Sequence, residues 1–312
     1  MITASCDETI DYEETAKAAT EAFGSSDFVF YPDQVQWFYE WCFSLGTTIV
    51  TLRDGNRKIG QLAMVRQPVI MNGVFEPAVL LVDLFIIKEF RSADCLRQLY
   101  GEVERQCVAK KIRFALGMPN AKALPVNAHF FRMRPFLWLP IRMGLAAPLR
   151  SPALIFSDPF ELMKKVEAIA LFTHYRTSED KNGLQWDEDK LFKRLCGPRN
   201  SYGIHATQDL LLISSARSAR GVKHTLLCGF FVRPGVPVEP GNVDVLVRAA
   251  CHLWKRPLFI YAGLNNALPI KSGFPLPRWL RPSRMLLQLR DFQPERPEPS
   301  FDRYQLIDFD FA

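Results

Sequence analysis

Apolar positions in the first half of the chain switch between helical and strand spacing. Residues 11–23 and 32–46 carry apolar side chains at helical intervals, which predicts two helices. Residues 47–55 and 58–73 follow and have the pattern of strands. The expected order is therefore two helices followed by antiparallel strands.

A strand, a helix and a strand come next. Residues 74–88 form the next predicted strand, and Asn72-Gly73 before it is a strong signal for a hairpin turn. Residues 92–111 predict an amphipathic helix, and residues 112–120 predict another strand. A strand, a crossover helix and a strand make a right-handed βαβ unit, attached here to an antiparallel hairpin sheet.

The second half of the chain repeats part of this pattern. Residues 83–120 align without a gap with residues 229–266, so that Gly117 meets Gly263. The two segments share the order strand, loop, helix and strand, which predicts a duplicated domain.

The repeat sets the expected domain boundaries. We expect one domain over residues 1–150 and a second over residues 160–312. A Pro-rich stretch at about 148–161 is the expected linker.

The composition is that of a folded protein. The 312 residues are 48% apolar and 23% charged, which is enough for two domains with sizeable cores. The net charge of +6 is mildly basic. Lys and Arg do not gather in the stripe that is typical of nucleic-acid binders, so no nucleic-acid partner is expected. The charge is either an ordinary solvated surface or an attraction for an anionic ligand or an acidic carrier protein.

Targeting and metal signals are absent from the sequence. The acidic N-terminus has no apolar segment, and no window of 18 uncharged apolar residues occurs. We therefore expect no signal peptide, no membrane span and a cytoplasmic protein. The seven cysteines are odd in number and include no CxxC pair, so neither a disulfide framework nor a metal site is expected.

Three stretches carry a resemblance to a known family. They are LVDLFIIKEFR (81–91), IRFALGMPN (112–120) and NAHFFRMRPF (127–136), the last of which is expected to begin as a short helix. Together with the order of elements, they resemble the GNAT superfamily of acyl-CoA-dependent N-acyltransferases, and more narrowly the tandem GNAT proteins. The resemblance covers most of residues 1–145 and, more weakly, residues 160–312.

The resemblance implies the fold class α/β (α+β), with two GNAT-like domains. Each would have a mixed, mostly antiparallel sheet with helices on both faces. It also implies that the pantetheine arm of acyl-CoA pairs with the edge of a splayed fourth strand. The pyrophosphate would then lie at the N-terminus of the next helix, where N–H groups and the helix dipole favour an anion. The candidate cofactor-binding residues are Phe85, Ile86, Ile87, Arg91, Ser92, Ala93, Asp94, Cys95, Leu96, Asn120, Asn127 and Phe131.

The expected phosphate loop departs from the family pattern, which is Arg/Gln-x-x-Gly-x-Gly/Ala. Here Asp94 and Leu96 stand at the two small positions, and Asp94 would repel a pyrophosphate. The alternative is that Arg91 is a surface residue and Asp94 complements the helix dipole. In the second copy, Gly235 and Gly241 precede the helix, so that loop is either a phosphate cradle or an ordinary turn.

Three residues are candidates for proton transfer. Asp83 stands inside an apolar strand and could deprotonate an amine if burial raises its pKa. The alternative is a paired acid at a strand end. Glu76, on the same strand, and His129, which could line a cleft, are the other candidates. The Tyr that the family uses to protonate the leaving thiolate is missing, because Phe130 and Phe131 stand in its place.

A dense aromatic cluster precedes the first predicted strand. In the family, this part of the chain shapes the acceptor pocket, but the side chains could equally pack on the sheet. The cluster comprises Phe28, Phe30, Tyr31, Trp37, Phe38, Tyr39 and Trp41.

These features predict an acyltransferase that moves an acyl group from acetyl-CoA or a longer acyl-CoA to a small-molecule amine or hydroxyl acceptor. Two alternatives stay open. The first is an enzyme of the same fold that takes its acyl group from acyl carrier protein, which the missing loop glycines and the basic charge favour. The second is a non-catalytic GNAT-fold binding protein, which the missing Tyr favours.

Overall fold

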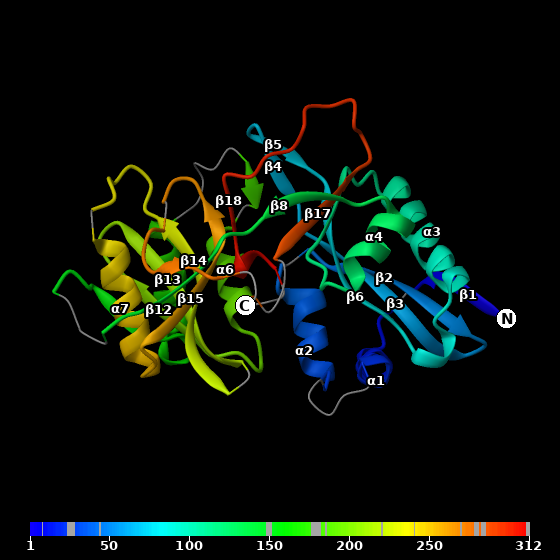
Figure 1. The fold of residues 1–312 in the computed structure, drawn as a ribbon, viewed down its shortest axis with the longest axis horizontal. Helices are drawn as coiled ribbons and strands as arrows, with labels where there is room; N and C mark the ends of the chain where they lie inside the picture. The colour runs from blue at the N-terminus through cyan, green and yellow to red at the C-terminus, as the bar shows by residue number, and fades with distance from the viewer. Residues whose placement is uncertain are drawn as a thin grey trace. The chain divides into compact units, whose positions relative to one another are not determined.

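The computed structural model divides the chain into two compact units. Unit 1 comprises Met1–Val69, Phe75–Trp138 and Ser283–Glu298, and unit 2 comprises Ile70–Val74, Leu139–Pro282 and Pro299–Ala312. Figure 1 shows their elements, coloured from blue at the N-terminus to red at the C-terminus. The structure describes residues 1–7, 9–23, 29–43, 45–147, 152–175, 182–184, 186–219, 221–239, 241–268, 270–277, 281 and 285–309.

Unit 1 is built on a seven-stranded sheet of order β1-β2-β3-β6-β7-β17-β8. Its strands are β1 (Ile2–Cys6), β2 (Thr47–Asp54), β3 (Arg57–Arg66), β6 (Ala78–Ile86), β7 (Phe114–Gly117), β8 (Arg134–Trp138) and β17 (Leu286–Asp291). Neighbouring strands are antiparallel except β6 and β7, which are parallel. The parallel pair is possible because a helix connects these two strands, as the sequence predicts.

The connecting helix is α3 (Ala93–Ala109). The Ser92 hydroxyl caps it by accepting the N–H of Cys95 at 3.2 Å. Leu99, Val103 and Cys107 recur at helical spacing and are completely buried in the core of the unit. The other helical segments of unit 1 are α1 (Tyr12–Phe23), α2 (Pro32–Gln36), the π-helical turn η1 (Trp37–Trp41), the 3-10 turn η2 (Lys88–Phe90) and α4 (Ala123–Phe131).

Unit 2 repeats the arrangement of strand, helix and parallel strand. Helix α7 (Asn242–Trp254) connects β14 (Val222–Val232) to β15 (Leu258–Asn265), and these two strands are parallel. The other strands of unit 2 are β9 (Ile141–Leu145), β10 (Phe156–Pro159), β11 (Gly183–Leu184), β12 (Tyr202–Ala206), β13 (Leu210–Ala219), β16 (Phe274–Pro275) and β18 (Arg303–Gln305). Its other helical segments are η3 (Phe160–Leu162), α5 (Lys165–His174), α6 (Glu188–Leu195) and η5 (Leu306–Asp308).

Each sheet contains strands from both halves of the chain. In unit 1, β17 lies between β7 and β8 and pairs antiparallel with both. In unit 2, β9 pairs antiparallel with β15. The expected division at residues 1–150 and 160–312 therefore describes neither sheet completely, and residues 148–151 of the expected linker lie outside the described residues.

Two local predictions had different outcomes. The predicted turn at Asn72-Gly73 connects β4 (Val69–Met71) to β5 (Val74–Glu76), and both turn residues have positive φ, as a tight hairpin requires. The short helix predicted to begin at Asn127 is present as α4, but α4 begins four residues earlier, at Ala123, and ends at Phe131. It begins earlier because the Asn120 carboxamide accepts two N–H groups just before its first turn.

Some features are absent from the described part of the chain. No described helix is long and apolar enough to cross a membrane. No group of three or more His, Cys, Asp or Glu side chains there could hold a metal ion. The seven cysteines all have free thiols.

Candidate active site

The gap between β6 and β7 defines the candidate donor site of unit 1. The two strands pair only where residues 78–80 lie beside residues 114–116, although β6 continues to Ile86 along β3. Among the described residues, no strand pairs with β6 beyond Leu80 on its β7 side. Such an edge can accept an extended chain that carries amide groups.

A bulge interrupts β6 at the start of this open edge. Asp83 and Leu84 both stand opposite Leu62 of β3, so β6 has one extra residue there. Asp83 has a φ of +51°, in the left-handed region that a residue with a side chain rarely adopts. Strained backbone of this kind persists where the surrounding structure enforces it, and it is common at functional sites.

The Asp83 carboxylate is held by a side chain from the aromatic cluster. The Tyr39 hydroxyl donates to Asp83 Oδ2 at 2.5 Å and accepts from Gln61 Nε2 at 2.9 Å. Burial, and after it the Asp83 charge, raises the pKa of Tyr39 well above its usual range. The hydroxyl therefore stays protonated and keeps the carboxylate in one orientation.

Gln61, which donates to Tyr39, has one side-chain atom whose hydrogen-bonding capacity is unsatisfied. Gln61 is completely buried on β3, and its Oε1 has no hydrogen-bond partner in the structure. A buried acceptor without a donor is costly, so a water or ligand donor at this position would stabilise it. The sequence pointed to Asp83 but not to Tyr39 or Gln61 individually, because their contacts join separate elements.

The N-terminus of α3 follows the open edge. Ala93 and Asp94 are exposed there, and Asp94 forms an ion pair with Arg97. Arg91 Nε donates to the Ile86 carbonyl at 2.9 Å, and its Nη2 donates to the Ala22 carbonyl at 2.8 Å. Two of the Arg91 nitrogens thus bind backbone carbonyls at the end of β6 and in α1.

Several of the other predicted cofactor residues are part of the core. Phe85, Ile86, Ile87 and Cys95 are buried, and the half-buried Leu96 packs against the same cluster. Their side chains shape the strand and the first turn of α3. Contact with a ligand here would therefore come from the backbone of β6.

The predicted residues of α4 form a buried network. The Asn127 Oδ1 accepts the Tyr100 hydroxyl at 2.5 Å, and its Nδ2 donates to Gln288 of β17 at 3.1 Å. Phe131 stacks on Tyr100 with ring centroids 5.3 Å apart. His129 is exposed and lies edge-to-face against Phe130. Of these residues, His129 is the most accessible.

Glu76 lies in a buried ion-pair cluster. Its Oε1 accepts from Arg113 Nη1 at 2.7 Å, and Arg296 approaches the same carboxylate at 2.5 Å. The side chains of Glu76 and Arg113 are only 5% and 3% exposed. Both Glu76 oxygens are engaged by these two arginines, so the geometry favours a structural role for Glu76 and leaves Asp83 as the candidate base.

Replacing Glu76 distinguishes a structural role of this residue from a catalytic one. Glu76→Gln is expected to lower the free energy of unfolding by about 2 kcal/mol, because it removes the closer of the two carboxylates that pair with the buried Arg113 guanidinium and leaves only Asp291 at 3.5 Å. Urea unfolding followed by circular dichroism measures this change. The exposed pair of Arg134 and Glu298 supplies the control, since Glu298→Gln should change stability by less than about 0.5 kcal/mol. Unchanged stability with loss of acyl transfer would instead make Glu76 catalytic.

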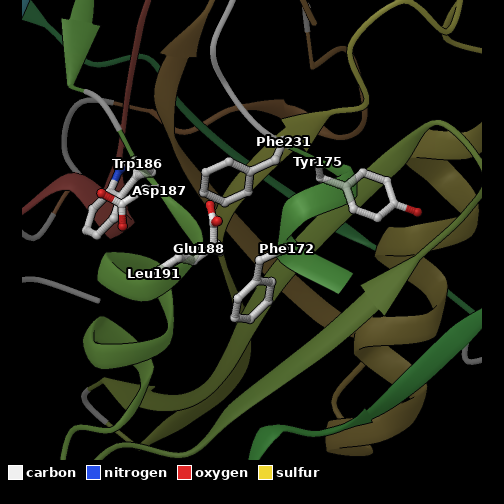
Figure 2. Close-up of a pocket in the computed structure, with 7 residues that line it drawn as sticks. All are labelled: Phe172, Tyr175, Trp186, Asp187, Glu188, Leu191 and Phe231. Carbon is white, nitrogen blue, oxygen red and sulfur yellow. The ribbon is translucent and has the colours of Figure 1, made fainter. Parts of the chain in front are cut away.

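Unit 2 contains a small cavity that is unsuited to a substrate. Figure 2 shows its lining by Phe172, Tyr175, Trp186, Asp187, Glu188, Leu191 and Phe231. Its volume of about 10 Å³ corresponds to about one water molecule. The Tyr175 hydroxyl points away from the cavity and donates to the Thr207 carbonyl.

Comparison with solved structures identifies the fold. A GCN5-related N-acetyltransferase from Kribbella flavida is 13% identical and matches with a TM-score of 0.61, over 93% of this chain and 71% of that chain. The N-myristoyltransferase of Saccharomyces cerevisiae, solved with bound myristoyl-CoA, is 12% identical with a TM-score of 0.59, over 98% and 83% of the two chains. A tandem GNAT protein from the clavulanic acid biosynthesis pathway is 8% identical with a TM-score of 0.57, over 93% and 98%.

Comparison at the level of sequence adds no further match. No protein-family model matches the chain, and no curated protein matches it. Because sequence identity is this low, the structural matches show the fold alone. The predicted fold is thereby confirmed: the chain has the GNAT fold and resembles the tandem GNAT proteins.

Proposed function

We propose that this protein transfers an acyl group from acyl-CoA to an amine or hydroxyl acceptor, with its donor site in unit 1. The observation that carries this proposal is the open edge of β6 beyond Leu80, which leads to the N-terminus of α3. The edge can pair with the amides of a pantetheine arm, and the helix start can hold the pyrophosphate. The known acyltransferases with this fold support the reaction class.

Asp83 is the proposed general base. The acceptor nitrogen attacks the thioester carbonyl carbon, and a C–N bond forms as the C–S bond breaks. Asp83 takes the proton that the nitrogen loses, and the CoA thiolate leaves and takes up a proton. The reaction needs little else besides positioning, because a thioester is already activated. Tyr39 acts here as a positioning residue through its hydrogen bond to Asp83.

A carrier-protein donor is the second candidate. Asp94 adds a negative charge at the helix start, where it would disfavour a pyrophosphate, and the net charge of +6 suits an acidic partner. A carrier protein presents its pantetheine without the nucleotide part of CoA. This donor would use the same β6 edge and would not need the loop before α3 to bind a pyrophosphate.

A charge at Ala93 tests the position of the pyrophosphate. Ala93→Glu should weaken the binding of CoA about fivefold to tenfold, because its carboxylate would repel the phosphates at the first position of α3. Pantetheine, which has no phosphates, should bind the variant and the wild type equally. Calorimetric titration with both ligands measures the difference.

The neutral variant Ala93→Gln is the control for size. It should bind CoA as the wild type does. Equal weakening by Glu and Gln would mean a steric effect, and no weakening by Glu would place the phosphates elsewhere. Binding of acylated carrier protein without any binding of CoA would favour the second candidate.

A further inference from the structure

The strands β14 and β15 of unit 2 separate in the same way as β6 and β7 of unit 1. They pair only where residues 225–227 lie beside residues 259–261. A bulge follows at once, because Cys228 is an extra residue against β13. Beyond it, β15 pairs with a different strand, so unit 2 also has a gap between its two central parallel strands.

This gap is filled by residues 303–309, which we name the C-terminal plug. Its strand β18 pairs antiparallel with β15 from Gly263 to Asn265. All seven residues of the plug are at most 5% exposed. In Figure 1 this segment is red and includes the strand labelled β18, which pairs with β15.

The plug also satisfies the backbone of β14. Gln305 Oε1 accepts the Phe230 N–H at 2.9 Å, and Gln305 Nε2 donates to the Phe230 carbonyl at 3.1 Å. A side-chain carboxamide thus makes the pair of hydrogen bonds that an amide of an extended ligand would make. Ile307 packs on Gly229, where an added Cβ would lie 2.9 Å from its Cγ2.

Further contacts anchor the plug. Arg194 is 1% exposed and donates to the carbonyls of Ile307 and Phe309, at 3.2 and 2.8 Å. Asp308 accepts the Trp186 indole N–H at 2.6 Å and the Gln305 N–H at 2.5 Å. A ligand that entered this gap would have to displace the plug and break its bonds to Arg194, Trp186 and Phe230.

We propose that the C-terminal plug permanently occupies the groove of unit 2 that corresponds to the donor site of unit 1. The two units then differ in role: unit 1 presents its open edge to an amide-bearing ligand, and unit 2 carries its own amide in Gln305. The chain therefore binds one acyl-CoA, in unit 1. The statement about unit 1 rests on the proposed function, whereas the occupied groove of unit 2 does not.

Hydrogen exchange of the full chain, with and without saturating acetyl-CoA, tests both parts. The segments 226–231 and 303–309 should exchange slowly in the free protein, and acetyl-CoA should leave them unchanged. It should slow exchange within residues 81–96. Slower exchange at 226–231, or faster exchange at 303–309, on addition of acetyl-CoA would overturn the proposal.

Two buried glutamines provide a matched test of the plug without any ligand. Gln305→Ala should raise the exchange rate of the Phe230 amide about tenfold, because it removes the acceptor of that N–H. Gln288→Ala, at an equally buried site in unit 1, should leave this amide unchanged. No response of Phe230 to Gln305→Ala would contradict the plug. If acetyl-CoA changed no exchange rate, the proposed function would be contradicted. The two variants Gln305→Ala and Gln288→Ala would then still test the plug.

Discussion

Asp83→Asn is expected to lower kcat/KM for acyl transfer by about 100-fold to 10,000-fold, the range for loss of a general base. Asparagine keeps the size of the side chain and tolerates the left-handed backbone at this position, so the bulge of β6 should survive. The amide has no lone pair basic enough to take the proton of the acceptor. Thiol release from acetyl-CoA with a panel of primary amines measures the rate.

Two further variants give this prediction its controls. Tyr39→Phe removes the hydroxyl that orients Asp83 and accepts from Gln61 but keeps the Asp83 carboxylate, so it should lower kcat by less and alter the pH profile. Asp189→Asn removes an exposed carboxylate of unit 2 that pairs with Lys193, and it should have no effect on the rate. Full activity of Asp83→Asn would remove Asp83 from the mechanism.

Acidification is expected to destabilise unit 2 through His205. This side chain is completely buried, with its Nδ1 at 2.8 Å from the Ser157 hydroxyl and its Nε2 at 2.7 Å from the Ser214 hydroxyl. Burial lowers the pKa of His205 from its usual 6.5 to about 3. The imidazole therefore stays neutral in the folded protein over a range in which the unfolded chain takes up a proton.

The direction in which stability changes with pH follows from proton uptake by the two states. Between pH 6.5 and 3 the unfolded state binds more protons at this site than the folded state, so stability falls as the pH falls. The full contribution is about 5 kcal/mol, of which about 3 kcal/mol is lost by pH 4.5. Above pH 6.5 the contribution is complete and constant.

Comparison with His205→Gln isolates this effect from the carboxylates that also titrate. The difference in unfolding free energy between the wild type and the variant should change by about 2 kcal/mol between pH 6.5 and pH 4.5, with the wild type losing more stability. His174→Gln, at an exposed site, is the matched control for replacing a histidine by glutamine. A constant difference between the wild type and His205→Gln would mean that His205 does not titrate in the expected way.

Local patterns in the sequence predicted the local elements well. The helix expected over 92–111 is confirmed, because both of its signals, an N-cap residue such as Ser92 and an apolar stripe, lie within a few adjacent residues. The same holds for the turn at Asn72-Gly73, which needs positive φ at both positions. The start of α4 was missed by four residues; Pro125 lies within its first turn, where proline fits a helix.

Pairings between distant segments could not be predicted. The strand β17 enters the sheet of unit 1 from the far end of the chain, and a sheet partner at such a distance leaves no periodic signal. Residues 301–312 have the pattern of a closing strand, but nothing in that pattern indicates which strands the plug of unit 2 would lie against; residues 310–312 lie outside the described residues. Its burial depends on Arg194, which nothing in the local sequence connects to it.

The candidate site shows the same limit. Asp83 was identified because an acid inside an apolar strand is unusual, and the bulge there gives it a physical setting. Its partner Tyr39 belongs to an aromatic cluster in which spacing alone distinguishes no member, and Phe28 of that cluster lies outside the described residues. Contact of Arg91 and Asn127 with a ligand stays a prediction. The hydrogen bonds that these two side chains make in the structure are to protein groups.

The central claim is that unit 1 binds acyl-CoA at the open edge of β6. Isothermal titration of the full chain with acetyl-CoA tests it most directly, because calorimetry gives both the affinity and the number of sites. The account predicts saturable binding with one equivalent per chain. Absence of binding at millimolar acetyl-CoA would contradict it.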